Sequence, residues 1–94
     1  MPDLKIGVIG VGHLGQQHAR ILSSLKGVQL VGVVDASRQQ AENIAMRYST
    51  TPYTSHLELL PKVDAAIIVV PTRFHFDVAR DFLEQGKALL IEKP

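Results

Sequence analysis

Three glycines with the spacing G-x-G-x-x-G, Gly10, Gly12 and Gly15, follow a short apolar run. This pattern alone is a weak signal, because short glycine patterns occur by chance. Here it follows a predicted strand and opens a predicted helix, and Asp35 stands 20 residues after Gly15. Together these features predict the phosphate-binding turn of a dinucleotide site. The alternative is a glycine-rich turn that holds no ligand.

Each residue of the turn has an expected mechanical role. Gly10 permits the tight turn from strand to helix, and Gly12 lets a pyrophosphate approach the backbone. Gly15 lets the helix pack closely on the sheet. The free N–H groups of His13 and Leu14, together with the helix dipole, would then face the anion.

Asp35 ends the second predicted strand, where a ribose would lie. Its carboxylate can accept hydrogen bonds from ribose hydroxyls and would repel a 2′-phosphate, which favours NAD over NADP. Arg38 complicates this reading, because a guanidinium can bind a 2′-phosphate or stack on adenine. The alternatives are a turn or N-cap acid for Asp35 and a solvated helix surface for Arg38. We expect NAD, with NADP use left open.

Two further groups of polar residues follow predicted strands. Thr72 and His75 come after the fourth strand, and because ligands bind beyond the carboxyl ends of the strands, we expect them to border the cofactor. The alternatives are an N-cap threonine and a helix-face histidine. Glu92 and Lys93 follow the last strand. A lysine near a nicotinamide can help to move a substrate proton, although spacing alone favours a charged strand end.

The elements that would position these residues alternate along the chain. Strands are predicted at residues 4–9, 28–34, 52–54, 63–70 and 88–91. Helices are predicted at residues 13–26, from 37 to 48, from 55 to 60 and from 75 to 85. This alternation implies right-handed crossovers and a parallel sheet. The expected fold is α/β, a Rossmann-type open sheet of about five strands with helices on both faces, in three α/β/α layers.

Two details of the predicted helices can be tested directly. The first helix should be closed by Gly27 in the left-handed conformation. In the second, Ser37 and Gln40 fit a capping box in which Gln40 reaches back to the start of the helix. The apolar stripe of the first helix should face the sheet, and it consists of Leu14, His18, Ile21, Leu22 and Leu25.

Length and composition exclude several classes of protein and of binding site. A length of 94 residues allows one domain at most. The chain has no cysteine, which excludes disulfides and thiolate metal sites, and its histidines lack a metal-ligand arrangement, so we predict no metal. A net charge of +1 gives no electrostatic case for nucleic acid. Without a signal-peptide pattern or an apolar run of about 20 residues, we expect a cytoplasmic protein that does not enter a membrane.

Four pieces of sequence, taken together, resemble the Gfo/Idh/MocA family, named after glucose–fructose oxidoreductase, inositol dehydrogenase and a rhizopine-catabolism protein. They are G-x-G-x-x-G-x-x-H-A from Gly10, then Asp35, P-T-x-x-H from Pro71, and the closing E-K-P from Glu92. The resemblance covers the whole chain. It implies an NAD(P)-dependent oxidoreductase that moves a hydride between a sugar, cyclitol or nucleotide-sugar hydroxyl carbon and the nicotinamide. Lys93 matches the family's active-site lysine, and Thr72, His75 and Glu92 match positions that line its cofactor.

Family members continue past Glu-Lys-Pro into a second domain that supplies the substrate pocket. We therefore expect the 94 residues to be the cofactor half alone, which binds a dinucleotide without efficient turnover. The last strand would then have an open apolar edge, so we also expect self-association. Two alternatives stay open: a non-catalytic NAD(P)-binding sensing or regulatory module, and an interaction fragment with no ligand.

Overall fold

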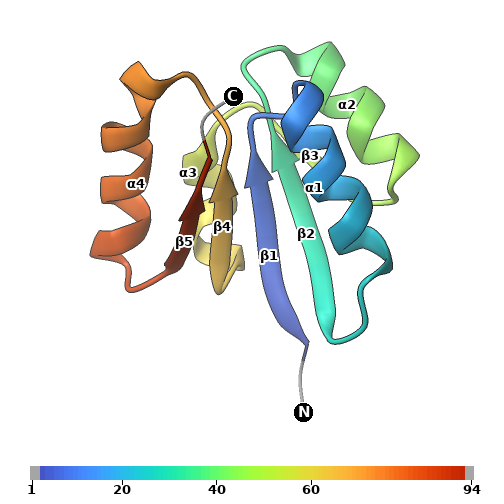
Figure 1. Ribbon diagram of the computed structural model, residues 1–94, viewed down its shortest axis with the longest axis horizontal. Coiled ribbons are helices and arrows are strands. Elements are labelled where there is room, and N and C mark those ends of the chain that lie inside the picture. The colour runs from blue at the N-terminus through green and yellow to red at the C-terminus, as the bar shows by residue number, and fades with distance from the viewer. Residues whose placement is uncertain (1–2, 93–94) are drawn as a thin grey trace.

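Five parallel strands form one sheet in the computed structural model, which describes residues 3–92 (Figure 1). The order across the sheet is β3-β2-β1-β4-β5. The strands are β1 (Leu4–Ile9), β2 (Val28–Val34), β3 (Thr51–Tyr53), β4 (Ala65–Ile68) and β5 (Ala88–Ile91). This arrangement confirms the predicted Rossmann-type α/β fold.

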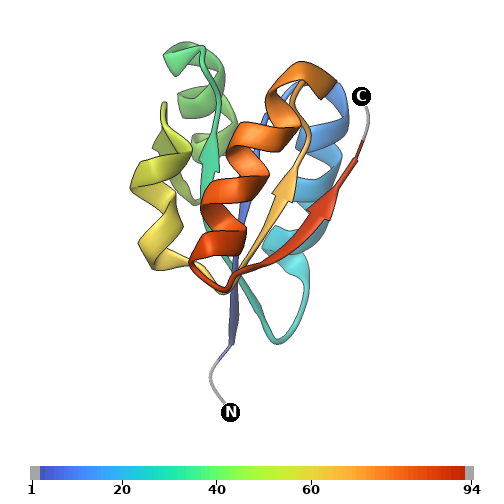
Figure 2. The same ribbon diagram turned by 90° about the vertical axis from the view of Figure 1, so that its left-hand side faces the viewer.

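Within residues 3–92, four α-helices cover the two faces of the sheet (Figure 2). They are α1 (His13–Ser24), α2 (Arg38–Arg47), α3 (His56–Leu59) and α4 (His75–Glu84). Two short 3₁₀ turns, η1 (Leu60–Lys62) and η2 (Thr72–Phe74), precede β4 and α4. Helices α1 and α2 share one apolar cluster with the sheet, and α3 and α4 share another on the opposite face. The predicted three layers are therefore present.

β1 is the central strand, and its last four residues are buried. It pairs in parallel with β2 on one side and β4 on the other, so the carboxyl ends of these three strands meet at one edge of the sheet. Figure 1 shows the turn from β1 to α1 and the connection from β4 to α4 at this edge. That placement is the one that open α/β sheets use for ligand sites.

Helix α1 faces the sheet with only part of the predicted stripe: Leu22 is buried and Leu14 packs against the same apolar cluster. Its buried residues are Gly15, Ala19 and Leu22, whereas Ile21 and Leu25 are 47% and 50% exposed. The cause is the contact at Gly15, where an added Cβ would lie 1.8 Å from the Gly10 carbonyl oxygen. The helix is rolled so that its small residues meet the turn. It also ends at Ser24, and the left-handed Gly27 (φ +81°) lies in the turn beyond.

The predicted capping box at the start of α2 is only half formed. Ser37 accepts a hydrogen bond from the Gln40 backbone N–H at 3.3 Å, as expected of an N-cap. The Gln40 side chain does not reach back, because the Ser37 N–H already donates to Asp35 Oδ1 at 3.0 Å. The Gln40 amide donates instead to the carbonyl of Val11, in the glycine turn.

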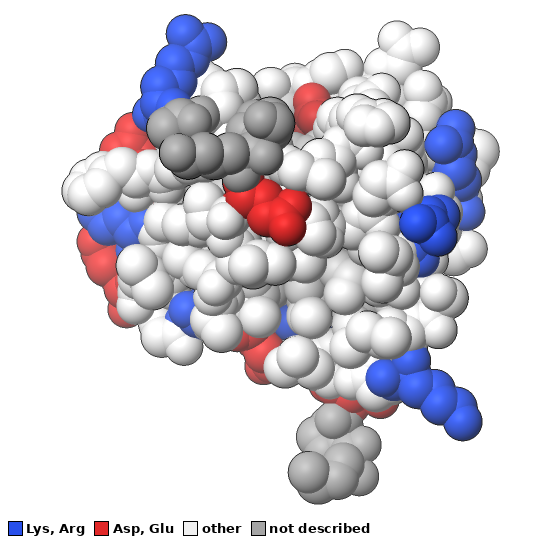
Figure 3. Space-filling model, in the orientation of Figure 1, with Lys and Arg blue, Asp and Glu red and all other residues white. Residues whose placement is uncertain are grey.

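On the face shown in Figure 3, the basic side chains form no single patch. Lysine and arginine side chains lie at separate places around its rim. No helix formed by residues 3–92 is long and apolar enough to cross a membrane. The same residues hold no cluster of three or more histidine or acidic side chains suited to a metal ion.

Candidate dinucleotide-binding site

The glycine turn has the geometry that its motif predicts. Gly10 has φ +94°, and a Cβ there would lie 2.4 Å from the carbonyl oxygen of Val69 at the end of β4. A side chain at Gly10 is therefore excluded by both conformation and space. Gly12 differs, because a Cβ built there would meet no atom within 4 Å. The space above Gly12 is open to a ligand.

Helix α1 begins at this open space without a side-chain cap. Gly12 is the N-cap residue, and its carbonyl accepts the first helical hydrogen bond from Gln16 at 2.9 Å. A shallow cavity of about 180 Å³ lies over the helix start, and it is lined by Gly12, His13, Leu14, Gly15 and Val69. The structure thus brings four of the predicted residues to one helix N-terminus that has no side-chain cap. Such a helix start favours the binding of an anion.

A second cavity, of about 350 Å³, lies beyond the carboxyl ends of β1, β2 and β4. The two turn residues Gly10 and Gly12 form one side, and Asp35 contributes the carboxylate. Apolar walls come from Val34, Val70 and other residues at strand ends or in the connection after β4. Sequence reasoning placed the loop from Pro71 to His75 beside the cofactor, and Pro71 and Phe74 do line this cavity, but it did not name Val34 or Val70 as part of the site. Their positions at the carboxyl ends of strands were the available signal.

Asp35 is tied to the turn through its side chain. Its Oδ2 accepts a hydrogen bond from the Val11 N–H, and its Oδ1 accepts one from the Ser37 N–H, both at 3.0 Å. An ionised carboxylate has about four acceptor positions. Two therefore remain for ribose hydroxyls at the rim of the larger cavity. The open space at Gly12 and the spare acceptors of Asp35 together fit a dinucleotide.

Comparison with known proteins agrees with this geometry. Residues 4–94 match the family model described as "Oxidoreductase family, NAD-binding Rossmann fold". The chain belongs to the Gfo/Idh/MocA family. The NAD-binding Rossmann fold predicted from the sequence is thereby confirmed, as is NAD as the cofactor of this fold.

Its relatives in the Gfo/Idh/MocA family are much longer. UDP-N-acetylglucosamine 3-dehydrogenase from Acidithiobacillus ferrooxidans is 42% identical over 94 residues, which are 100% of this chain and 29% of the relative. Inositol 2-dehydrogenase from Rhizobium meliloti is 36% identical over 92 residues, 97% of this chain and 28% of the relative. The chain therefore spans less than a third of the length of these relatives.

Two solved structures show the likeness in three dimensions. The Acidithiobacillus ferrooxidans UDP-N-acetylglucosamine 3-dehydrogenase superposes with a TM-score of 0.90 at 41% identity, covering 100% of this chain and 30% of the other. GenD2 from gentamicin A biosynthesis, solved in complex with NAD, gives a TM-score of 0.93 at 28% identity, covering 100% of this chain and 28% of the other.

Two further predicted cofactor residues of this Gfo/Idh/MocA chain follow strands that border the site. Arg38 is exposed at the start of α2 and lines neither cavity. Thr72 begins η2, between cavity residues Pro71 and Phe74. The N-cap of α4 is Phe74 rather than Thr72, because η2 separates the threonine from the helix.

His75 holds the connection after β4. Its Nε2 lies 2.6 Å from the Val70 carbonyl oxygen, so the ring donates its N–H to the backbone of the cavity wall. The ring lines neither cavity. In this structure His75 shapes the site through Val70, and its predicted contact with the cofactor stays a prediction.

Glu92 points to helix α1. Its Oε2 lies 2.6 Å from His18 Nε2, and its backbone N–H donates at 3.0 Å to the carbonyl of Ile68, the last residue of β4. In this structure Glu92 contacts the helix that starts at the glycine turn, and its predicted role in lining the cofactor stays a prediction. Lys93, the predicted catalytic residue, lies outside the described residues.

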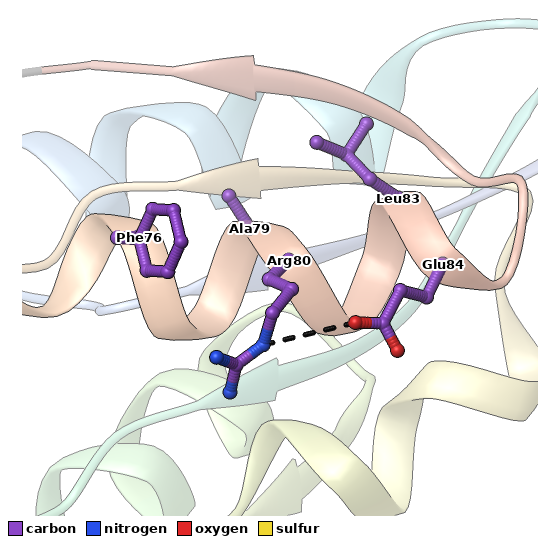
Figure 4. Close-up of a pocket in the computed structure, with 5 residues that line it drawn as sticks. All are labelled: Phe76, Ala79, Arg80, Leu83 and Glu84. Atoms are coloured by element: carbon purple, nitrogen blue, oxygen red, sulfur yellow. Dashed lines mark ion pairs between the residues drawn. The ribbon is translucent and has the colours of Figure 1, made fainter.

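A third hollow lies on α4 and shares no residue with the other two (Figure 4). It is lined by Phe76, Ala79, Arg80, Leu83 and Glu84. Phe76 and Leu83 are 71% and 62% exposed, and Arg80 pairs with Glu84 at 3.8 Å. Its walls are mostly apolar and contain no residue of the glycine motif, so it is a surface groove rather than part of the dinucleotide site.

Proposed function

We propose that residues 10–15 bind the pyrophosphate of NAD and that Asp35 binds the ribose of its adenosine half. The observation that carries this proposal is the junction of the two cavities at Gly12, where open space meets an uncapped helix start and a carboxylate. The apolar walls of the larger cavity suit the adenine base, since ligand sites combine apolar walls with a few polar groups.

The same geometry favours NAD over NADP. A 2′-phosphate on the ribose would lie against the Asp35 carboxylate, and like charges repel. Arg38, the residue that could offset this repulsion, is exposed and lines neither cavity. We therefore expect tighter binding of NAD than of NADP, with NADP as a weaker ligand of the same site.

We propose that the chain supplies the cofactor-binding part of a dehydrogenase. Its relatives are named for oxidation of UDP-N-acetylglucosamine and inositol, which supports a sugar, cyclitol or nucleotide-sugar hydroxyl as the substrate class. Bound NAD supplies the hydride acceptor. Lys93 remains the proposed residue for moving the hydroxyl proton. Because the chain spans less than a third of these relatives, we propose that the 94 residues bind cofactor without efficient turnover.

Calorimetric titration of the 94-residue chain with NAD and NADP tests these proposals. We expect a dissociation constant for NAD in the micromolar range, and a rise in melting temperature at millimolar NAD, since a ligand stabilises the folded state that binds it. Absence of NAD binding would contradict the site. NAD reduction with inositol or UDP-N-acetylglucosamine at rates typical of enzymes, about 1 per second or faster, would contradict the limit on turnover.

We also propose that the chain self-associates through the edge of β5. Within residues 3–92 this strand pairs only with β4, and Leu90 and Ile91 are 49% and 45% exposed. An unpaired apolar edge is a template for another strand. The exposed Phe76 and Leu83 of α4 extend the apolar surface of the same half of the molecule. We keep the cytoplasm as the proposed location, to be checked by cell fractionation.

A further inference from the structure

The backbone of Val11 is held on both sides by side chains from other parts of the chain. Its N–H donates to Asp35 Oδ2 at 3.0 Å. Its carbonyl accepts from Gln40 Nε2 at 2.7 Å and from Gln16 Nε2 at 3.3 Å. The Val11 side chain is itself fully buried. The residue at the centre of the glycine turn is therefore fixed in orientation.

Fixing the Val11 carbonyl also fixes the next N–H group. A trans peptide is planar, so the Val11 carbonyl and the Gly12 N–H point in opposite directions. Gly12 lines both cavities, and within residues 3–92 its N–H donates to no protein acceptor. The peptide thus has one end bound by Gln40 and the other left at the cavity junction.

Hydrogen bonds to the carbonyl act on the N–H electronically as well. Chains of hydrogen bonds polarise one another, so donation to the Val11 oxygen increases the partial positive charge on the Gly12 hydrogen. A more positive hydrogen binds a phosphate oxygen more strongly, because hydrogen bonds to ionised groups are the strong ones.

Gln40 is the main donor to this carbonyl because its bond is the shorter of the two. In a capping box the Gln40 side chain would accept a hydrogen bond from the Ser37 N–H. Here that N–H donates to Asp35 instead, so the Gln40 side chain is available to the Val11 carbonyl. Asp35 therefore acts in two ways. It accepts the Val11 N–H directly, and by accepting the Ser37 N–H it leaves Gln40 able to donate to the Val11 carbonyl.

We propose that Gln40 is a positioning residue for the pyrophosphate of the dinucleotide. Its amide orients and polarises the Val11–Gly12 peptide, so that the Gly12 N–H donates to a phosphate oxygen. This inference rests on the proposed binding of NAD at the turn and assigns a role to a residue outside the glycine motif.

The test compares Gln40→Met with Gln39→Met. Methionine keeps the length of glutamine and its helix propensity but has no N–H donor. Gln39 is the exposed neighbour on the same turn of α2 and serves as the matched control. Each variant is titrated with ADP-ribose, which contains the pyrophosphate, and with adenosine, which lacks it. Q40M should weaken the binding of ADP-ribose about tenfold and change the binding of adenosine by less than about twofold. Q39M should change neither.

The Gly12 amide gives a direct signature in ¹⁵N–¹H spectra. ADP-ribose should move its proton resonance downfield in the wild-type chain, and Q40M should remove most of that movement. Equal weakening of ADP-ribose and adenosine would mean that Gln40 only supports the fold, and unchanged affinities would also overturn the proposal. If Q40M does not fold, Gln40→Glu retains the size and hydrogen-bonding shape but replaces the donor with an acceptor. Failure of the wild type to bind either ligand would instead overturn the NAD site itself.

Discussion

His18 on helix α1 and Glu92 after β5 are joined by a hydrogen bond of 2.6 Å between Nε2 and Oε2. The two residues are 74 positions apart and both side chains are largely shielded from solvent, at 20% and 33% exposed. The bond links the helix that starts at the glycine turn to the end of the sheet at which Lys93 follows. The motif histidine is therefore bonded directly to the first residue of the closing motif.

Replacing His18 with alanine should loosen the end of β5. Loss of one hydrogen bond to a charged, partly exposed group should lower the free energy of unfolding by about 1 kcal/mol. The local effect should be larger, and hydrogen exchange of the Glu92 N–H, which is bonded to Ile68, should speed up. Urea unfolding and amide exchange measure the two effects.

His56→Ala is the matched control for this change. His56 pairs with Asp81 at 2.7 Å with similar exposure, and this pair links α3 to α4. His56→Ala should lower the free energy of unfolding by a similar amount and leave hydrogen exchange of the Glu92 N–H unchanged. Equal acceleration in both variants would mean that exchange reports global stability rather than the His18 contact.

Much of the fold followed from local patterns. The bounds of β1, β2 and β5 agree with prediction, because each is an apolar run ended by polar residues or glycine. The predicted strand at 63–70 is regular only over Ala65–Ile68, although Val69 still donates to Ile9 in the ladder. Helix α2 buries Ala41, Ile44 and Ala45, which share one face at helical spacing.

The contacts that complete the site did not follow from local patterns. The roll of α1 is set by the approach of Gly15 to Gly10, and the Gln40 bond to Val11 depends on how α2 sits against the turn. Such contacts join residues on separate elements, and propensity and periodicity carry no information about their relative placement. Motif spacing found Gly12 and Asp35 because one supersecondary unit fixes their geometry.

Gly12→Ala should mainly weaken NAD binding, whereas Gly15→Ala should mainly lower the stability of the fold. Gly12 has open space and φ −69°, so Gly12→Ala should change stability by about 1 kcal/mol at most, as alanine is the poorer N-cap. Its methyl group would occupy the space proposed for the pyrophosphate and weaken NAD binding by about tenfold or more.

The added methyl group of Gly15→Ala would clash with the Gly10 carbonyl, so this variant should lose about 3 kcal/mol of stability. Thermal unfolding and calorimetry distinguish the two. Unchanged NAD affinity in G12A would place the pyrophosphate elsewhere.

Asp35→Asn should reduce the discrimination between NAD and NADP. The amide keeps the shape of the side chain but removes the negative charge that repels a 2′-phosphate. We expect the ratio of the NADP dissociation constant to the NAD dissociation constant to fall by about tenfold, mostly through tighter NADP binding. One N–H, of Val11 or Ser37, also loses its acceptor, which costs about 1–3 kcal/mol of stability.

Asp64→Asn separates that stability cost from the effect on binding. Asp64 also accepts a backbone N–H, that of Lys5 at 2.9 Å, but it lies at the amino ends of β1 and β4. D64N should therefore lose stability without changing either affinity. A similar change of the NAD to NADP ratio in both variants would mean that Asp35 does not contact the ribose.

Proline at position 91 should block self-association while preserving the sheet. The N–H groups of Ala88 and Glu92 donate to Asp64 and Ile68, on the side of β4. Because a strand alternates its N–H directions, that of Ile91 points to the outer edge. A proline is tolerated where the missing N–H faces solvent, so Ile91→Pro should leave the β4 ladder intact. Leu90→Pro, which removes an N–H on the β4 side, should destabilise the fold instead. Sedimentation equilibrium should give a monomer for I91P and a concentration-dependent mass for the wild type, whereas a wild-type monomer at millimolar concentration would exclude association through this edge.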